Sequence, residues 1–225
     1  MDHTELKMKI KNIFFDFDGV IAESVNAKTD AFREMYIGYG PEIADKVVDY
    51  HIRNGGVSRF EKIRYWEKEF FNRDISEEEL QTLANKFSSL VLTKVIESDR
   101  VDGVVDFLNK YAKELKFWII TGTPTTEIEI IAEKRELSDF FIGIHGSPEK
   151  KKFWTEYLIQ EHGLNREETL FLGDATTDYD AAKHSNLFFA LRDNEENKEL
   201  FKQYEGMRFS DFHELEEILL NRKMI

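Results

Sequence analysis

Two aspartates that follow the first apolar segment of the chain are the clearest candidates for chemistry. The segment Ile13–Phe17 predicts a β-strand, and Asp16 and Asp18 alternate with phenylalanine at its end, directly before Gly19. Alternate residues of an extended segment point to the same side, so the two carboxylates are expected to lie together. Neighbouring carboxylates repel unless a cation or a shared proton separates their roles. The pattern indicates an acid–base or metal site, or alternatively a solvated turn in which Gly19 adopts a positive φ.

A second pair of acids ends another apolar segment. Leu170–Leu172 runs into Gly173 and Asp174, and Asp178 follows one helical turn later. These acids would face the same cleft as the first pair. Several carboxylates in one cleft are costly without a divalent cation, and ligands that are all oxygen atoms favour Mg²⁺. The chain has no Cys, and its His residues lack HxxxH or ExxH spacing, so zinc, iron–sulfur and thiolate chemistry find no support.

A hydroxyl-rich turn follows a third apolar segment. Phe117–Ile120 predicts a strand that ends in Thr121, Gly122 and Thr123, and Pro124 after them suits the first position of a helix. A hydroxyl and main-chain amides at a strand-to-helix turn can hold phosphoryl oxygens. Most such threonines are simple helix caps, which is the alternative for this segment.

Three consecutive lysines, Lys150 to Lys152, follow the predicted strand Phe140–Ile144. Such a run is usually the solvated start of a helix. Cations at the amino end of a helix oppose its dipole, however, which indicates a reason beyond folding.

The elements that must position these residues are predicted by short apolar segments that alternate with helical patterns. The remaining predicted strand is Leu187–Leu191, and the predicted helices are Thr126–Glu136, Phe153–His162, Tyr179–His184 and Phe212–Asn221. Apolar runs without alternation are typical of strands covered on both faces, and alternation of strand with helix predicts a parallel sheet. Ligands bind at the carboxyl ends of the strands of such sheets, where all of the candidate groups are expected.

One long stretch, from about Ala22 to Arg100, shows no convincing strand and only helical patterns. Ser76 before three glutamates predicts an N-cap, with Glu79 in the capping-box position. Apolar residues then recur at helical spacing through Val91. The stretch predicts a second, helical domain inserted after the first strand.

Composition limits the classes of partner. The chain has 225 residues, of which 41% are hydrophobic, with 44 acidic and 31 basic residues, a net charge of −13 and a pI near 5.0. It can form a packed core, while the acidic balance argues against nucleic acid and anionic membranes as partners. No 18-residue apolar run and no secretory signal in Met1–Lys11 are evident, so a cytoplasmic protein is expected. The sequence carries no signal for oligomeric state.

The four segments, in this order, resemble the haloacid dehalogenase-like hydrolase superfamily. The DxDG motif matches Asp16, Asp18 and Gly19, and the GDxxxD motif matches Gly173, Asp174 and Asp178. The resemblance implies an α/β fold, a Rossmann-like parallel sheet core with an inserted α-helical cap. The core would comprise residues 1–21 and 100–225, and the cap residues 22–99.

The resemblance implies roles for the acids. Asp16 would be the nucleophile that forms an aspartyl-phosphate, and Asp18 the general acid and then the base. Mg²⁺ would be held by the Asp16 carboxylate, the Asp18 main-chain carbonyl and Asp174, with Asp178 as a ligand or its partner.

Thr121 and one lysine would neutralise the transferring group, with Gly122 and Thr123 binding substrate beside them. The GSPxxK form of the motif counts to Lys151, while Lys150 and Lys152 remain alternatives.

The reaction implied is hydrolysis of a small phosphorylated metabolite. Dehalogenases of this superfamily lack the acid at the position of Asp18, so its presence argues for phosphorus chemistry. The expected enzyme is a Mg²⁺-dependent phosphatase acting on a sugar phosphate or a phosphoglycolate-like ester. A binding protein without activity is the non-enzymatic alternative, disfavoured because all four segments are intact.

A basic segment in the predicted cap gives a second enzymatic alternative. The stretch GVSR, which ends at Arg59, resembles the β-phosphoglucomutases, in which this arginine grips a distal phosphate. Lys62 would share a helix face with Arg59, after Ser58 as N-cap; a merely solvated basic helix is the competing interpretation. Lys28 stands where such mutases place a histidine, and their KPxP stretch is missing, which argues for hydrolysis.

Overall fold

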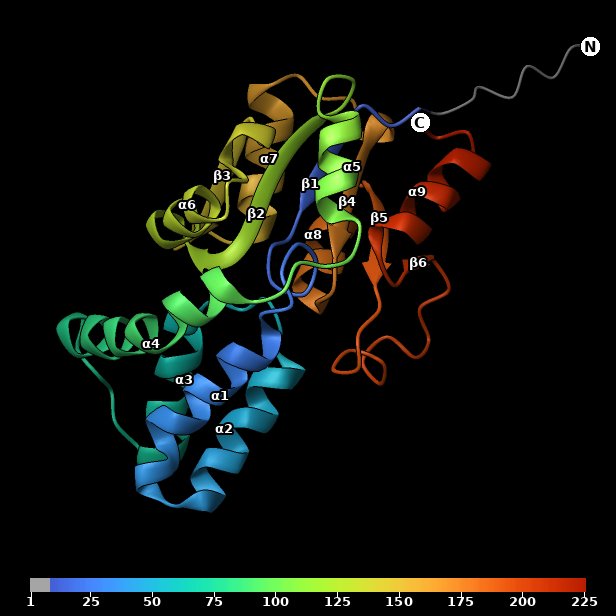
Figure 1. Ribbon diagram of the computed structural model, residues 1–225. Helices are drawn as coiled ribbons and strands as arrows, with labels where there is room; N and C mark the ends of the chain where they lie inside the picture. Colours follow the sequence, from blue (N-terminus) through green and yellow to red (C-terminus); the bar gives the residue numbers. More distant parts are fainter. Residues whose placement is uncertain (1–8) are drawn as a thin grey trace, which may run out of the picture.

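The centre of the molecule is a parallel β-sheet with helices on both of its faces. The computed structural model describes residues 9–225, so the predictions made for residues 1–8 lie outside it (Figure 1). The strands of the described chain are β1 (Asn12–Phe15), β2 (Lys116–Pro124), β3 (Gly143–Ser147), β4 (Thr169–Gly173), β5 (Phe188–Arg192) and β6 (Met207–Phe209). Their order is β3-β2-β1-β4-β5-β6, which confirms the predicted Rossmann-like α/β fold.

Alternation along the strands divides the apolar residues between the two faces of the sheet. Phe14, Trp118 and Phe171 pack with residues of α7 (Lys151–Glu161) and α8 (Thr176–His184). Their strand neighbours, such as Phe15 and Phe117, belong to a second cluster on the opposite face. That face is covered by α5 (Val104–Tyr111), α6 (Thr125–Lys134) and α9 (Phe212–Asn221). Because both faces are covered, the strands are continuously apolar.

The strand order places the site. The chain runs from β1 outward to β2 and β3, and then returns to β4 on the other side of β1. The carboxyl ends of β1 and β4 therefore lie at the point where the strand order reverses, which is where open α/β sheets bind ligands. Asp16 and Asp174 are the first residues after these two strands.

Four helices between β1 and β2 form a separate group beside this edge of the sheet (Figure 1). They are α1 (Val25–Tyr36), α2 (Pro41–Arg53), α3 (Arg59–Phe71) and α4 (Glu77–Glu97). Both N-caps predicted here are confirmed: the Ser58 hydroxyl accepts from the Glu61 N–H, and Ser76 forms a complete capping box with Glu79. We refer to this group as the helical cap. The boundary at residues 22–99 stays a prediction, although Ala22 and Arg100 do pair where the chain enters and leaves the group.

Several predicted bounds were wrong. Strand β2 extends through Thr121–Pro124, so Pro124 is the N-cap of α6 and not its first residue. Strand β3 begins three residues later than the start predicted from Phe140, which lies in a 3₁₀ turn. Strand β6 was missed, because three residues carry too little pattern to be recognised. No helix within residues 9–225 is long and apolar enough to cross a membrane.

Candidate active site

Asp16 lies buried in the cleft, directly after β1. Its Oδ1 accepts a hydrogen bond from the Phe17 N–H at 2.7 Å, and Lys151 Nζ lies 2.8 Å from its Oδ2. Each carboxylate oxygen has two lone pairs, so neither contact uses up the nucleophilic capacity of the group. Asp16 is therefore an oriented carboxylate beside a cation.

The three lysines that the sequence left open occupy different surroundings. Lys151 is buried at the start of α7 and also donates to Asp178 Oδ1 at 2.6 Å, whereas Lys152 is exposed and Lys150 pairs with Glu61 at the surface. Burial alone would lower the pKa of Lys151, but Asp16 and Asp178 raise it above its usual value, so it is an ammonium. Only Lys151 lies among the clustered acids.

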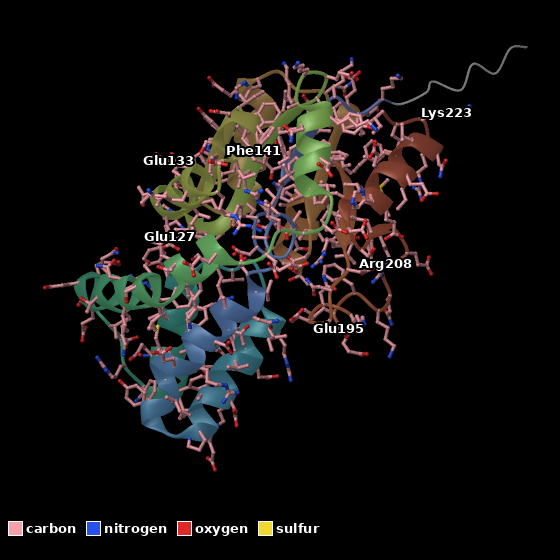
Figure 2. The ribbon with its side chains drawn as sticks, in the orientation of Figure 1. Glu127, Glu133, Phe141, Glu195, Arg208 and Lys223 are labelled. Atoms are coloured by element: carbon pink, nitrogen blue, oxygen red, sulfur yellow. The ribbon has the colours of Figure 1, made fainter. Side chains whose placement is uncertain are left out.

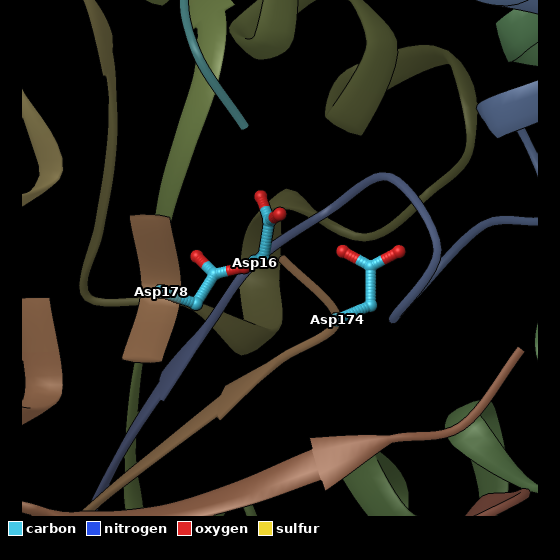
Figure 3. A group of neighbouring side chains, drawn as sticks. All are labelled: Asp16, Asp174 and Asp178. Atoms are coloured by element: carbon cyan, nitrogen blue, oxygen red, sulfur yellow. The ribbon is translucent and has the colours of Figure 1, made fainter. Parts of the chain in front are cut away.

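Three carboxylates meet at this point: Asp16, Asp174 and Asp178 (Figure 3). One oxygen from each lies within 4.8 Å of the others. Burial, together with the charge of Asp16, raises the pKa of both Asp174 and Asp178, and Lys151 opposes this rise. One lysine faces three carboxylates, so the cluster carries surplus negative charge. An all-oxygen donor set with surplus negative charge fits a hard divalent cation such as Mg²⁺.

The two acids that follow β4 have different partners. Asp178 accepts from Lys151 and, through Oδ2, from the Ala175 N–H at 3.0 Å. Asp174 Oδ2 accepts from the Asn194 side chain at 2.8 Å. Among residues 9–225, donors thus engage both oxygens of Asp178 but only one of Asp174. This favours Asp174 as a direct metal ligand and Asp178 as the residue that orients Lys151.

Gly19 makes room for this arrangement. It has a φ of +76°, and a Cβ there would lie 2.1 Å from Asp174 Oδ2. Only glycine adopts this φ readily and leaves room for the Asp174 carboxylate. Gly19, which the sequence predicted for a turn, is therefore required by the acid cluster as well.

Asp18 lies in the same pocket but contacts other groups. Lys28 Nζ forms an ion pair with Asp18 Oδ2, and hydroxyls of Ser24 and Thr123 donate to the carboxylate at 2.6 and 3.2 Å. Burial by itself would raise the pKa of Asp18, but Lys28 and these hydrogen bonds hold it below its usual value. Asp18 is therefore a carboxylate whose charge is balanced from the cap.

The threonine turn lies between the sheet and the cap. Thr121 is buried, and its Oγ1 accepts from the Thr123 N–H at 3.3 Å. A Cβ on Gly122 would lie 2.5 Å from the carbonyl oxygen of Gly56, so the cap loop rests directly on this turn. The hydroxyl of Thr177 adds a hydrogen bond to the Gly55 carbonyl at 3.3 Å. The cap covers the site in this structure.

The basic helix α3 faces inward. Arg59 and Lys62 are buried, so the interpretation as a solvated helix was wrong. Both residues line the pocket that contains Asp16 and Asp18. Arg59 makes a two-pronged ion pair with Glu127 of α6, in which Nη1 lies 2.8 Å from Oε2. Figure 2 shows Glu127 where the sheet meets the cap. Arg59 therefore joins the cap to the core.

We expect Glu127→Gln to lower the free energy of unfolding by about 3 kcal/mol, because it leaves the buried Arg59 guanidinium without its counter-charge. Urea unfolding measures the change. Glu129→Gln, at an exposed position of the same helix, is the matched control. Equal urea midpoints for the two variants would contradict the inferred role of this ion pair.

Sequence reasoning missed three residues with roles in positioning. Asn194 donates a hydrogen bond to Asp174 and so orients it. Asn194 could have been found because it follows strand β5 closely, just as Asp16 and Asp174 follow their strands. Lys28 was noticed only as a departure from a family pattern, whereas it contacts Asp18. Glu127 carried no signal, because its partner Arg59 is remote in the sequence.

Comparison with known proteins identifies the family of this chain. The family model of haloacid dehalogenase-like hydrolases matches residues 10–186. The fold and the acid cluster are those of an α/β enzyme, and the chain belongs to the haloacid dehalogenase-like hydrolase family.

A phosphoglycolate phosphatase of Photorhabdus laumondii is 26% identical over 180 residues, which cover 77% of this chain and 76% of that protein. β-Phosphoglucomutase of Clostridium difficile has a TM-score of 0.76 at 21% identity, covering 95% of this chain and 97% of the other. A predicted phosphatase of Clostridium acetobutylicum has a TM-score of 0.72 at 17% identity, covering 95% and 99%. The two structures establish similarity of fold alone.

Proposed function

We propose that this protein is a Mg²⁺-dependent phosphatase that hydrolyses a small phosphomonoester, a sugar phosphate or a phosphoglycolate-like compound, through an aspartyl-phosphate. The observation that carries the proposal is the buried Lys151, which touches both Asp16 and Asp178 beside Asp174. A carboxylate nucleophile, a cation and a metal-binding acid pair are the groups that phosphoryl transfer requires. The phosphatase relative supports the same reaction.

In the first step, an oxygen of Asp16 attacks phosphorus and the ester P–O bond breaks. Asp18, which takes up a proton from solvent before this step, passes that proton to the leaving oxygen, and the leaving group departs as an alcohol. In the second step, Asp18 takes a proton from water as the water attacks phosphorus, which releases inorganic phosphate and restores Asp16. The ionised Asp18 that Lys28 stabilises is the form that this second step needs.

Positive charge and hydrogen-bond donors hold the transferring group. Lys151 balances the charge of the phosphoryl oxygens, and Thr121 and the main chain at Gly122 and Thr123 contribute further donors. Asp16, Asp174 and the Asp18 carbonyl would hold Mg²⁺, with Asp178 at their side. When bound, the metal supplies charge neutralisation at the phosphoryl oxygens.

Hydrolysis is favoured over a mutase reaction by the state of Arg59. A mutase needs this guanidinium for the distal phosphate, and here Glu127 engages it in a two-pronged pair. Product analysis with a sugar 1-phosphate separates the two reactions: free phosphate supports the phosphatase, and an isomerised sugar phosphate supports the mutase.

Removal of divalent cations with EDTA should lower phosphate release from p-nitrophenyl phosphate by about 100-fold or more, and added Mg²⁺ should restore it. The physical reason is that the repelling acids and the phosphate dianion lose the charge that balances them. Circular dichroism of the EDTA-treated protein controls for unfolding. Full activity in EDTA, or no turnover of any phosphate ester with Mg²⁺ bound, would contradict the proposal.

A further inference from the structure

Lys62 is a buried cation that the proposed chemistry does not use. It lies in α3, its side chain is fully buried, and it lines the pocket that contains Asp16 and Asp18. Its Nζ has one hydrogen-bond partner among the described residues, His51 Nδ1 of α2, at 2.8 Å. Two of its three N–H donors are therefore left without an acceptor from these residues.

The other cations of this pocket are balanced by carboxylates, and Lys62 is not. Lys28 pairs with Asp18 and Arg59 pairs with Glu127, whereas none of the described carboxylates forms an ion pair with Lys62. Burial, reinforced by the nearby Lys28 and opposed in part by Asp18, which itself pairs with Lys28, lowers the pKa of Lys62 to about 7. A buried charge is costly unless a partner compensates it. Lys62 therefore lacks the anionic partner that would compensate its charge.

His51 adds a second donor at the same place. When Lys62 is protonated, its ammonium can only donate, so Nδ1 of His51 then accepts from Lys62 and the ring hydrogen lies on Nε2. Burial and the neighbouring Lys62 lower the pKa of His51 well below its usual value, which keeps the ring neutral. No hydrogen bond to Nε2 is formed within residues 9–225, and His51 also lines the pocket. The ring is held by Phe32, at 4.9 Å between centroids.

We propose that Lys62 and His51 form a receptor in the cap for a second anionic group of the substrate, so that the preferred substrate is a small phosphate ester that also carries a carboxylate or another phosphate. This inference rests on the proposed phosphatase function and deepens it. The phosphoryl group lies against Asp16 and Lys151, and the second anion binds the donors of Lys62 and His51. Arg59, which sequence reasoning placed in this role, serves instead to join cap and core.

Binding to the Asp16→Asn variant, which cannot form the phospho-enzyme, tests the receptor by calorimetry in Mg²⁺. Two pairs of ligands differ in the second anion: 2-phosphoglycolate against 2-hydroxyethyl phosphate, and glucose 1,6-bisphosphate against glucose 1-phosphate. In at least one pair, we expect the ligand with two anionic groups to bind about 10- to 100-fold more tightly than its partner with one. This factor is the one expected for a hydrogen bond to a buried charged group. The pair that shows the preference identifies the second anion as carboxylate or phosphate.

Lys62→Met, introduced into the Asp16→Asn variant, should abolish this preference, because it lowers the affinity for the ligands with two anionic groups far more than the affinity for those with one. Lys68→Met, at an exposed position of the same helix, is the matched control. His51→Phe, which preserves the ring against Phe32, should reduce the preference as a second variant. Since Lys62→Met removes an uncompensated buried charge, the ligand-free variant should also have an unchanged or higher melting temperature, whereas a merely structural lysine would lower it.

The receptor is overturned if neither ligand pair shows a preference, or if the preference survives Lys62→Met. The phosphatase proposal has a separate test, turnover of 2-hydroxyethyl phosphate and p-nitrophenyl phosphate by the wild-type protein. Turnover without a preference for a second anion rejects the receptor alone. A preference in binding without any turnover rejects the phosphatase alone.

Discussion

Asp16→Asn is expected to lower kcat for phosphate ester hydrolysis by about 10⁴-fold or more, since the first chemical step loses its nucleophile. The asparagine side-chain oxygen can still accept from the Phe17 N–H, so the local backbone should persist. Phosphate release at saturating substrate measures the effect. Trapping of ³²P-labelled protein from a labelled substrate measures the intermediate directly.

Asp106→Asn, at an exposed position of α5, is the matched control and should retain full activity. Residual turnover near the wild-type rate in Asp16→Asn would reject both the nucleophile and the aspartyl-phosphate route. Loss of turnover with labelling retained at another residue would reject the assignment of Asp16 while leaving a covalent mechanism in place.

Lys151→Met should have the second largest effect, on stability as well as on activity. Its removal leaves the fully buried Asp178 without its cation, at an expected cost of about 3–5 kcal/mol in the free energy of unfolding. It also removes a charge that faces the transferring group, for which we expect a loss of about 10²- to 10³-fold in kcat. Urea unfolding and steady-state kinetics measure the two changes.

The neighbouring lysines provide controls within the same segment. Lys150→Met and Lys152→Met alter exposed side chains, so both should stay within about 0.5 kcal/mol of wild-type stability. If either of them lost activity as Lys151→Met does, the assignment of the cation would be wrong. If all three kept full activity, no lysine of this run would take part in the reaction.

Much of the site could be predicted because it follows from local rules. Asp16 and Asp174 each come directly after an apolar strand, and the carboxyl ends of parallel strands meet at one edge. The register of Lys151 within its run was obtained from a family motif, and its buried position agrees with that register. The capping box at Ser76 involves residues three apart and so was also readable.

The cap was harder to interpret, because its chemistry depends on residues that are distant in sequence. Arg59 and Lys62 look alike as basic residues of one helix, and the sequence assigned both to substrate. Their difference lies in their partners: Glu127 reaches Arg59 from α6, whereas Lys62 finds only the neutral His51. No periodicity or spacing in α3 contains that information.

The α/β architecture and the gathering of acids at one edge of the sheet could be predicted from the sequence, since hydrophobic patterns and strand ends are local properties. The folded chain was needed to see which cations are neutralised: Lys28 by Asp18, Arg59 by Glu127, and Lys62 by no described carboxylate. The physical reason is that the cost of a charge depends on its burial and on groups within a few ångströms. Those neighbours come from separate elements and meet only in the folded chain.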